Sequence, residues 1–314
     1  MKVALIHYHL RTGGVTRVLE NQSASLSAAG IDHLILSSTD FSTSGISPSV
    51  PAATIPALDY LSKTSLTPTN LYQDLLAACQ RQFGSAPDLW HLHNHSLGKN
   101  ILFPGLLKLL AESQTPLILQ PHDFAEDNRP ANYPLLADNT IYPLAPQIHY
   151  AFINNRDRQL LTKAGLPPQQ THPLPNPVQL RFPPESRPPA PQTHNLILYP
   201  IRGIRRKNLG EILLLAALAP ADTTFAITLA PENPTWQPIH DRWQHLAEQL
   251  QLPILFNVAD RIPPSPGLPS TYQSWRNAAS HIITTSIAEG FGLAFLEPAA
   301  LKKPLLGRDL PEIT

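Results

Sequence analysis

Ser-Ile-Ala-Glu-Gly-Phe-Gly-Leu-Ala-Phe-Leu-Glu, residues 286–297, joins a short apolar run rich in β-branched residues (282–285) to a helical pattern over residues 293–301. The stretch predicts a buried strand, a glycine-containing turn and a helix, and Pro298 is compatible with that helix only near its first turn. This strand–turn–helix order recurs along the chain, and such repetition is typical of an α/β protein with parallel sheets.

Two carboxylates, Glu289 and Glu297, flank the predicted turn with seven residues between them. The free N–H groups at a helix N-terminus suit an anion or a sugar hydroxyl. Carboxylates beside them suit the diols of a ribose or a hexose, because each carboxylate accepts several hydrogen bonds. Taken alone, the spacing is also what an ordinary strand-to-helix turn with two solvated glutamates shows.

Composition narrows the class of protein. The chain has 314 residues, enough for two domains of ordinary size, and 42% of them are apolar. Its formal net charge of zero argues against nucleic acid or an anionic membrane as a partner, and no peripheral membrane contact is evident.

The chain holds a single cysteine, Cys79, so no disulfide can form within it. This fits a reducing compartment. Its first residues turn polar too soon for a signal peptide, and no apolar run approaches membrane-spanning length. These features predict a soluble cytoplasmic protein.

The N-terminal half begins with a βαβ pattern. Residues 2–7 predict a buried strand, residues 15–26 a helix and residues 31–36 a second strand. Gly13 and Gly14 therefore lie in the first β-to-α loop, at the edge where doubly wound sheets bind ligands. The dinucleotide-binding G-x-G-x-x-G spacing is absent, and the glycine pair indicates either close approach to a phosphate or sugar or a plain tight turn.

Histidines follow the later strands of this half. His91, His93 and His95 alternate, which places them on one strand face and raises the possibility of a metal site, although no fourth ligand is evident. His122 and Asp123 follow the apolar strand 116–120. His122 is a candidate base or hydroxyl donor, and the alternative is a loop histidine paired locally with Asp123.

A proline-rich segment, residues 182–193, predicts a linker between an N-terminal domain, residues 1–181, and a C-terminal domain, residues 194–314. The second domain opens with a strand over 195–199 and a basic loop over 200–208. Arg202 and Lys207 in this region indicate an electropositive pocket for a diphosphate, or else a solvated basic loop. Because both loops follow parallel strands, the basic loop and the glutamate turn are expected at one sheet edge.

Residues 286–297, continued by 298–312, resemble the nucleotide-sugar signature of family-4 (group 1) retaining glycosyltransferases of the GT-B fold. The other matches occur in the family's order: Gly13 with Gly14, residues 91–94, His122 with Asp123, residues 175–178, and Arg202 with Lys207.

The resemblance implies two Rossmann-like, doubly wound α/β domains that face a cleft. It implies transfer of a hexose from a nucleotide sugar, UDP- or GDP-linked, to a hydroxyl of a small molecule, glycan or lipid, with retention of anomeric configuration. It implies neither a cofactor nor a metal ion, since Arg and Lys offset the diphosphate charge.

The resemblance also assigns roles by position. His122 and Glu289 are the implied catalytic residues, both near the donor sugar, with His122 also able to reach the reacting phosphate. The implied donor-binding residues are Gly13 and Gly14 for the phosphate or sugar, Arg202 and Lys207 for the diphosphate, Asn257 and Val258 for the base, main-chain groups of Phe291, Gly292 and Leu293 for the sugar, and Glu297 for the ribose.

Family members usually continue beyond the position matched by Glu312, so the resemblance predicts a second domain that is incomplete at its C-terminal end. The alternative function is therefore a fragment that binds nucleotide sugar without efficient transfer. An NAD-linked dehydrogenase is disfavoured by the missing glycine fingerprint. The opening residues 6–15 resemble transferases that make small glycosides such as mannosylglucosylglycerate.

Overall fold

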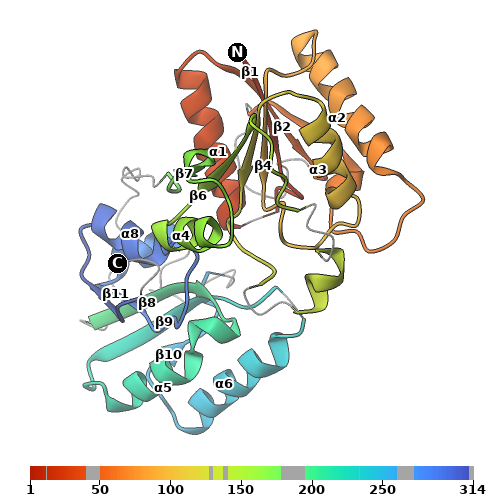
Figure 1. Ribbon diagram of the computed structural model, residues 1–314. Coiled ribbons are helices and arrows are strands. Elements are labelled where there is room, and N and C mark those ends of the chain that lie inside the picture. Colours follow the sequence, from red (N-terminus) through yellow and green to blue (C-terminus); the bar gives the residue numbers. More distant parts are fainter. Residues whose placement is uncertain are drawn as a thin grey trace. The chain divides into compact units, whose positions relative to one another are not determined.

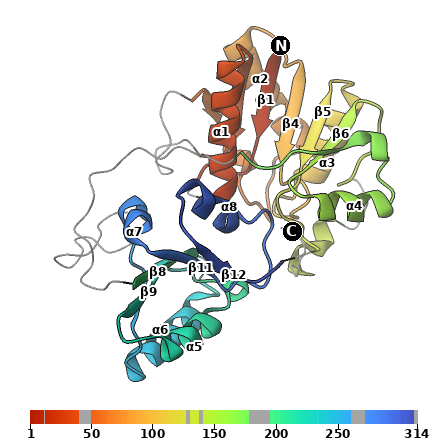
Figure 2. The ribbon, with the colours of Figure 1, turned by 90° about the vertical axis from the view of Figure 1, so that its left-hand side faces the viewer.

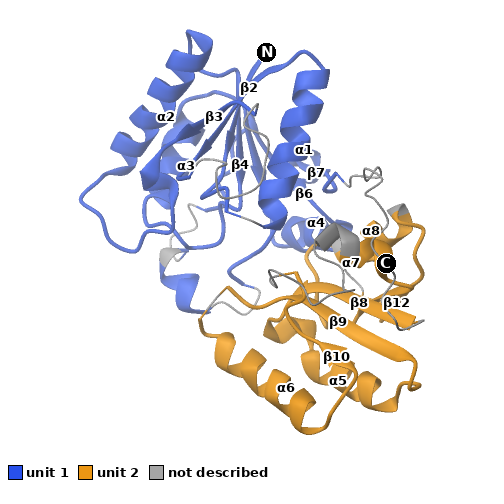
Figure 3. Cartoon of the chain, turned by 180° about the vertical axis from the view of Figure 1, so that it is seen from behind, with its two compact units in different colours: residues 1–177 blue, residues 178–314 orange. Residues whose placement is uncertain are grey.

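The computed structural model describes residues 1–11, 13–39, 50–126, 130–136, 141–177, 195–232, 234–259 and 272–310. The chain divides into two compact units, residues 1–177 and 178–314 (Figure 3). The linker predicted over residues 182–193 lies outside the described residues.

The first unit is built on a parallel sheet in the order β3-β2-β1-β4-β5-β6-β7 (Figure 1). Leu-rich apolar runs form its central strands because both faces are covered. The strands are β1 (Lys2–Ile6), β2 (Asp32–Ser37), β3 (Ala52–Thr54), β4 (Leu89–His93), β5 (Leu117–Gln120), β6 (Ile148–Phe152) and β7 (Thr171–Pro173).

Helices cover both faces of this sheet. Leu19 of α1 packs with Val3 and Leu5 on one face, and Leu75 and Phe103 belong to the larger core that α2 and α3 form on the other. The helices are α1 (Gly14–Ala28), α2 (Pro68–Phe83), α3 (Phe103–Glu112) and α4 (Asn155–Lys163), with 3₁₀ turns at η2 (Pro56–Leu58), η3 (Pro130–Leu135) and η4 (Pro168–Gln170).

The second unit repeats the plan with a parallel sheet in the order β10-β9-β8-β11-β12. Helices α5 and α6 lie on one face of the sheet, and α7 and α8 lie on the other (Figure 2). The elements are β8 (Asn195–Arg202), η5 (Arg205–Lys207), α5 (Leu209–Leu218), β9 (Thr223–Leu229), α6 (Gln237–Gln249), β10 (Ile254–Leu255), α7 (Tyr272–Ala278), β11 (His281–Thr284), α8 (Leu293–Ala300) and β12 (Leu305–Gly307).

Two local predictions were wrong. The strand expected to end at Tyr199 runs through Pro200 to Arg202, and its pairing with β9 shifts register between Tyr199 and Arg202. Such a bulge accommodates the proline, which has no N–H to donate to the ladder. Pro298 is the sixth residue of α8 and not part of its first turn. A proline there removes one helical hydrogen bond, which this two-turn helix tolerates.

Each sheet has one point where the strand order reverses direction, between β1 and β4 in the first unit and between β8 and β11 in the second. Connections leave such neighbouring strands in opposite directions, which opens a crevice at their carboxyl ends. We call these the first-unit edge (the ends of β1, β4 and β5) and the second-unit edge (the ends of β8 and β11). Among the described residues, no helix is long and apolar enough to cross a membrane.

Candidate functional site

At the second-unit edge, the basic loop after β8 is bonded directly to the glutamate turn after β11. The Tyr199 hydroxyl donates a hydrogen bond to the Lys207 carbonyl oxygen at 2.7 Å, and the Thr285 hydroxyl donates to the same oxygen at 2.9 Å. The backbone N–H of Ile287 donates to the Arg206 carbonyl at 2.9 Å. The two loops thus lie together at one sheet edge, as the sequence predicts.

Glu289 connects the side chains of the two loops. Its carboxylate forms an ion pair with Lys207 and accepts a hydrogen bond from Arg206 Nη1 at 3.0 Å. Only 7% of the Glu289 side chain is exposed. Burial raises the pKa of Glu289, but the charges of Lys207 and then Arg206 outweigh it and lower the pKa below its ordinary value. Two cations therefore surround one ionised carboxylate, which leaves a net positive charge at this edge.

Arg206 is a site residue that the sequence reasoning missed. It also donates to the Ala288 carbonyl oxygen at 3.0 Å, and 42% of its side chain is exposed. The signal was the run Arg205-Arg206-Lys207, which forms the short 3₁₀ turn η5. Arg202, which the sequence singled out, is the last residue of β8 and forms an ion pair with Glu232 at 2.8 Å.

The start of α8 presents backbone N–H groups at the same edge. Gly292 precedes the helix in the left-handed region (φ 74°), which favours glycine, and no side chain caps the helix N-terminus. Phe291 is half-buried, and Leu293 is the first helical residue. The first N–H groups of α8 therefore have no side-chain acceptor from this cap, which is the arrangement that suits an oxygen-rich ligand.

Glu297 has a buried counterion that the sequence did not identify. Arg276 of α7 is only 5% exposed, and its Nη2 lies 3.5 Å from Glu297 Oε2. Burial raises the pKa of Glu297, and the Arg276 charge opposes this rise only in part. The available signal was a basic residue directly after Trp275 and close to Ala278 and Ala279, because a buried cation requires a partner.

Asn257 and Val258, the predicted base-binding residues, follow β10. Asn257 adopts a left-handed conformation (φ 56°). The Val258 side chain is buried against Trp275, and its N–H donates to the Ile227 carbonyl at 3.1 Å. Val258 therefore has only its carbonyl oxygen left to offer a ligand.

At the first-unit edge, Gly13 and Gly14 begin α1. Gly13 is extended (φ 177°), a conformation open to any residue, and no side chain caps the helix. A Cβ atom added at Gly14 would meet nothing within 4 Å. Packing within the unit therefore requires neither glycine, and there is open space in front of Gly14.

His122 is held by two residues of the β4 end. Its Nε2 lies 2.9 Å from His93 Nδ1, and its backbone N–H donates to Asn94 Oδ1 at 2.7 Å. The ring partner is thus His93, which corrects the local pairing with Asp123 considered above. Burial, and then the neighbouring His91, lower the pKa of His122 to about 3, so the ring is neutral at pH 7.

The alternating histidines do not converge on a common point. His91 Nε2 donates to Gln120 Oε1 at 2.9 Å, and its ring stacks on His93. Asn94 is left-handed (φ 57°) and ends the strand, so His95 packs against Tyr142 and Tyr150. Within the described part of the chain, no group of three or more His, Cys, Asp or Glu side chains is arranged to hold a metal ion.

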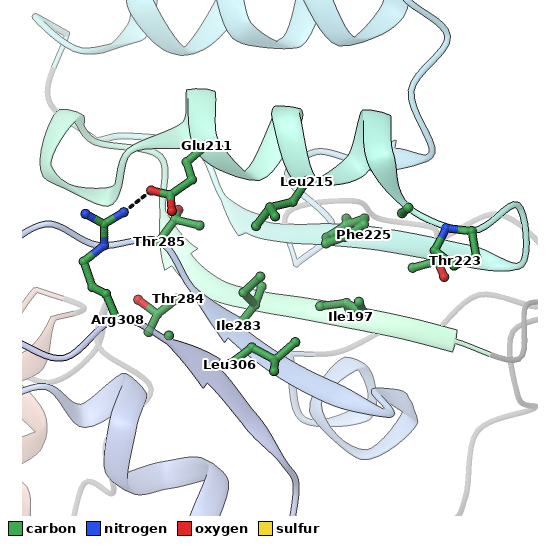
Figure 4. A pocket seen from close by; sticks show the side chains of 13 residues that line it. Ile197, Glu211, Leu215, Thr223, Phe225, Ile283, Thr284, Thr285, Leu306 and Arg308 are labelled. Carbon is green, nitrogen blue, oxygen red and sulfur yellow. Dashed lines mark hydrogen bonds and ion pairs between the residues drawn. The ribbon is translucent and has the colours of Figure 1, made fainter.

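A cavity of about 440 Å³ lies between α5 and the sheet of the second unit (Figure 4). Its walls are mostly apolar, including Leu215, Phe225 and Ile283, and the ion pair of Arg308 with Glu211 stands at one end. None of the residues that the sequence predicts for the site lines it.

No model of a known protein family matches the chain. The chain is similar to a mannosylglucosyl-3-phosphoglycerate synthase from Petrotoga mobilis, with 26% identity over 337 residues. The match covers 98% of the chain and 65% of that protein, so the chain spans just under two thirds of the relative's length.

Two solved structures share the fold. HepE from Anabaena, solved with UDP and glucose, aligns with a TM-score of 0.67 and 14% identity over 97% of the chain and 80% of its own. WaaG, a glycosyltransferase involved in lipopolysaccharide biosynthesis, aligns with a TM-score of 0.60 and 13% identity over 98% of the chain and 80% of its own. The chain therefore has the GT-B fold of these glycosyltransferases.

Proposed function

We propose that the chain is a glycosyltransferase that moves a hexose from a UDP- or GDP-linked donor to a hydroxyl acceptor with retention of anomeric configuration, as group 1, family-4 enzymes do. The observation that carries the proposal is the contact between the basic loop and the glutamate turn, in which Lys207 and Arg206 share the carboxylate of Glu289. A net positive cluster beside an uncapped helix N-terminus suits a sugar diphosphate.

In this proposal, Lys207 and Arg206 offset the diphosphate charge that develops as the glycosidic bond to the leaving group breaks. No metal ion is then needed. The α8 N–H groups and Glu289 bind hydroxyls of the donor sugar, and Glu297 binds the ribose. Arg202 contributes a further positive charge at the end of β8.

The names and bound ligands of the similar proteins indicate which substrates to test first. The relative from Petrotoga mobilis is named for a product in which mannose is joined to glucosyl-3-phosphoglycerate, and the HepE structures contain UDP, UDP-glucose or glucose. We propose GDP-mannose and UDP-glucose as the first donors to test. Glucosyl-3-phosphoglycerate and glucosylglycerate are the corresponding acceptors, which places the reacting hydroxyl on a sugar.

The test is a transfer assay on the full chain. Each donor is incubated with each acceptor in the presence of EDTA, nucleoside diphosphate release is measured, and the product's anomeric configuration is read by NMR. We expect release to depend on the acceptor and the product to keep the donor's α configuration. An inverted product would overturn retention, and activity lost on EDTA treatment would overturn metal independence.

Paired variants test the roles of the two glutamates. Glu297→Gln is expected to raise the donor dissociation constant, because it removes a charged acceptor of ribose hydroxyls. Glu289→Gln is expected mainly to lower kcat. The exposed Glu112→Gln serves as the matched control. Wild-type kinetics in both site variants would remove the glutamates from the site. Donor binding without turnover in the unaltered chain would instead support a binding protein.

A further inference from the structure

His93 and His122 form an edge-to-edge pair within the first unit. The 2.9 Å contact joins His93 Nδ1 to His122 Nε2, and the two ring planes differ by only 13°, with centroids 5.2 Å apart. Imidazole lone pairs lie in the ring plane, so near-coplanar rings suit an N–H···N hydrogen bond. His93 is wholly buried and His122 is 6% exposed. Burial holds the pKa of both rings below the ordinary value, so both are neutral at pH 7.

A hydrogen bond between two neutral imidazoles allows only two proton arrangements. Either His93 donates from Nδ1 and His122 carries its proton on Nδ1, or His122 donates from Nε2 and His93 carries its proton on Nε2. The first arrangement makes His122 Nδ1 a donor, and the second makes it an acceptor. The choice between them thus decides what His122 offers to a ligand.

The exposures of the two residues favour the first arrangement. Neither His93 Nε2 nor His122 Nδ1 has a hydrogen-bond partner among the described residues. A buried N–H without an acceptor is rarer in proteins than a buried acceptor without a donor. Both nitrogens are buried, but His122 as a residue is 6% exposed and His93 is not exposed at all. The unmatched proton is therefore better placed on His122 Nδ1, which lies on the residue closer to the surface.

We propose that His93 is a positioning residue whose Nδ1–H donates to His122 Nε2 and fixes His122 in the tautomer that donates from Nδ1. Resting on the proposed function, this leaves His122 Nδ1–H to donate to a substrate oxygen at the first-unit edge. The backbone is fixed as well, because Asn94 Oδ1 accepts hydrogen bonds from the N–H groups of His122 at 2.7 Å and Asp123 at 3.1 Å. Consecutive residues of the β4 end thus set both the ring and the loop.

The tautomers can be read directly from long-range ¹H–¹⁵N spectra of the full chain labelled with ¹⁵N-histidine. We expect Nδ1–H signals for both His93 and His122. In His93→Phe, which cannot donate, His122 is expected to shift to the Nε2–H form that free imidazole side chains favour. In His93→Asn, an amide N–H replaces Nδ1–H, and the Nδ1–H form of His122 is expected to persist.

His95→Phe is the matched control. His95 is a wholly buried histidine two residues along, and neither of its nitrogens has a hydrogen-bond partner among the described residues. Its replacement is expected to leave the His122 tautomer unchanged. An Nε2–H signal for His122 in the unaltered chain, or an unchanged Nδ1–H signal in His93→Phe, would overturn the proposal.

Kinetics add a second readout. We expect kcat of His93→Phe to fall about tenfold, as loss of one oriented hydrogen bond predicts, with KM for the acceptor unchanged and kcat largely restored in His93→Asn. Equal losses in His93→Phe and His93→Asn would reduce His93 to a packing role. If the unaltered chain transfers no sugar, the proposed function fails, while the spectra still decide the tautomer.

Discussion

At the first-unit edge the buried titratable side chains are mainly imidazoles, whereas those at the second-unit edge include the carboxylate of Glu289 and the ammonium group of Lys207. His93 and His122 are kept neutral by burial and are joined by a hydrogen bond. Glu289 keeps its charge because Lys207 and Arg206 are close enough to offset its desolvation. The two edges of the same fold therefore stabilise buried polar side chains in different ways, with neutral imidazoles at the first-unit edge and ion-paired charges at the second-unit edge. Only the second-unit edge carries a net charge for an anionic ligand.

The largest expected effect is a loss of stability on acidification, which breaks the neutrality of the first-unit edge. Burial lowers the pKa of His7, His95 and His122 to about 3 and of His91 to about 4. The unfolded chain therefore binds more protons below pH 6.5, so stability is full above that pH and falls as the pH drops toward 4.

From pH 7.5 to 5.5, four such histidines are expected to lower the free energy of unfolding by roughly 5 kcal/mol. Urea unfolding at the two pH values measures this change. His95→Phe sharpens the test, because it is expected to reduce the loss by about 1 kcal/mol. An unfolding midpoint that does not move between the two pH values would contradict burial of neutral imidazoles.

Lys207→Met is expected to break the charge balance of the second-unit edge. It leaves the buried carboxylate of Glu289 with Arg206 alone, and we expect a loss of about 2 kcal/mol in the free energy of unfolding. Urea unfolding measures the loss. Lys108→Met is the matched control, since its pairing with Glu112 is solvent-exposed (69% and 60%) and is worth under about 0.5 kcal/mol. Equal losses in the two variants would show that burial does not strengthen the Glu289 pair.

Arg276→Met tests the buried counterion of Glu297. Burial raises the pKa of Glu297, and removing Arg276 removes the positive charge that opposes this rise. We expect donor binding by Arg276→Met to be weaker at pH 6 than at pH 8, with a larger difference between the two pH values than in the unaltered chain. Calorimetry at the two pH values measures this. Arg276→Lys keeps the charge and is expected to bind donor as the unaltered chain does, whereas a pH-independent loss in Arg276→Met would point to packing alone.

The smallest expected effect on stability is that of Arg202→Ala. Its partner Glu232 is 62% exposed, and Arg202 itself 29%, so the pair contributes under about 0.5 kcal/mol. Thermal unfolding measures it. A much larger loss would show that Arg202 is part of the buried charge network and not at its margin.

The fold was largely predictable because the chain repeats strand, turn and helix with few interruptions. The apolar runs 2–7 and 116–120 form β1 and β5, and the predicted helix 15–26 lies within α1. The end of β8 was not predicted, because a proline in the sequence is typical of the end of a strand. Only the pairing with β9 shows that the strand continues through a bulge to Arg202.

The site was predictable where neighbours in the chain act together and not where distant segments meet. The glutamate turn and the basic loop could be found from local patterns, and both follow strands at the switch point. The contact of Arg276 with Glu297 and that of His93 with His122 join separate segments, so no local pattern specifies them. The role of Val258 in base binding stays a prediction, and its burial in the cluster that contains Trp275 could not be read from the local sequence.

The most direct test of the account is isothermal titration calorimetry of UDP and GDP, and of their glucose and mannose conjugates, into the full chain and Lys207→Met. We expect at least one nucleotide to bind saturably to the unaltered chain with a stoichiometry of one. Its affinity for Lys207→Met is expected to be at least tenfold weaker, and its affinity for Lys108→Met is expected to equal that for the unaltered chain. No binding of any of these nucleotides to the unaltered chain, or equal affinity in a folded Lys207→Met variant, would contradict the account.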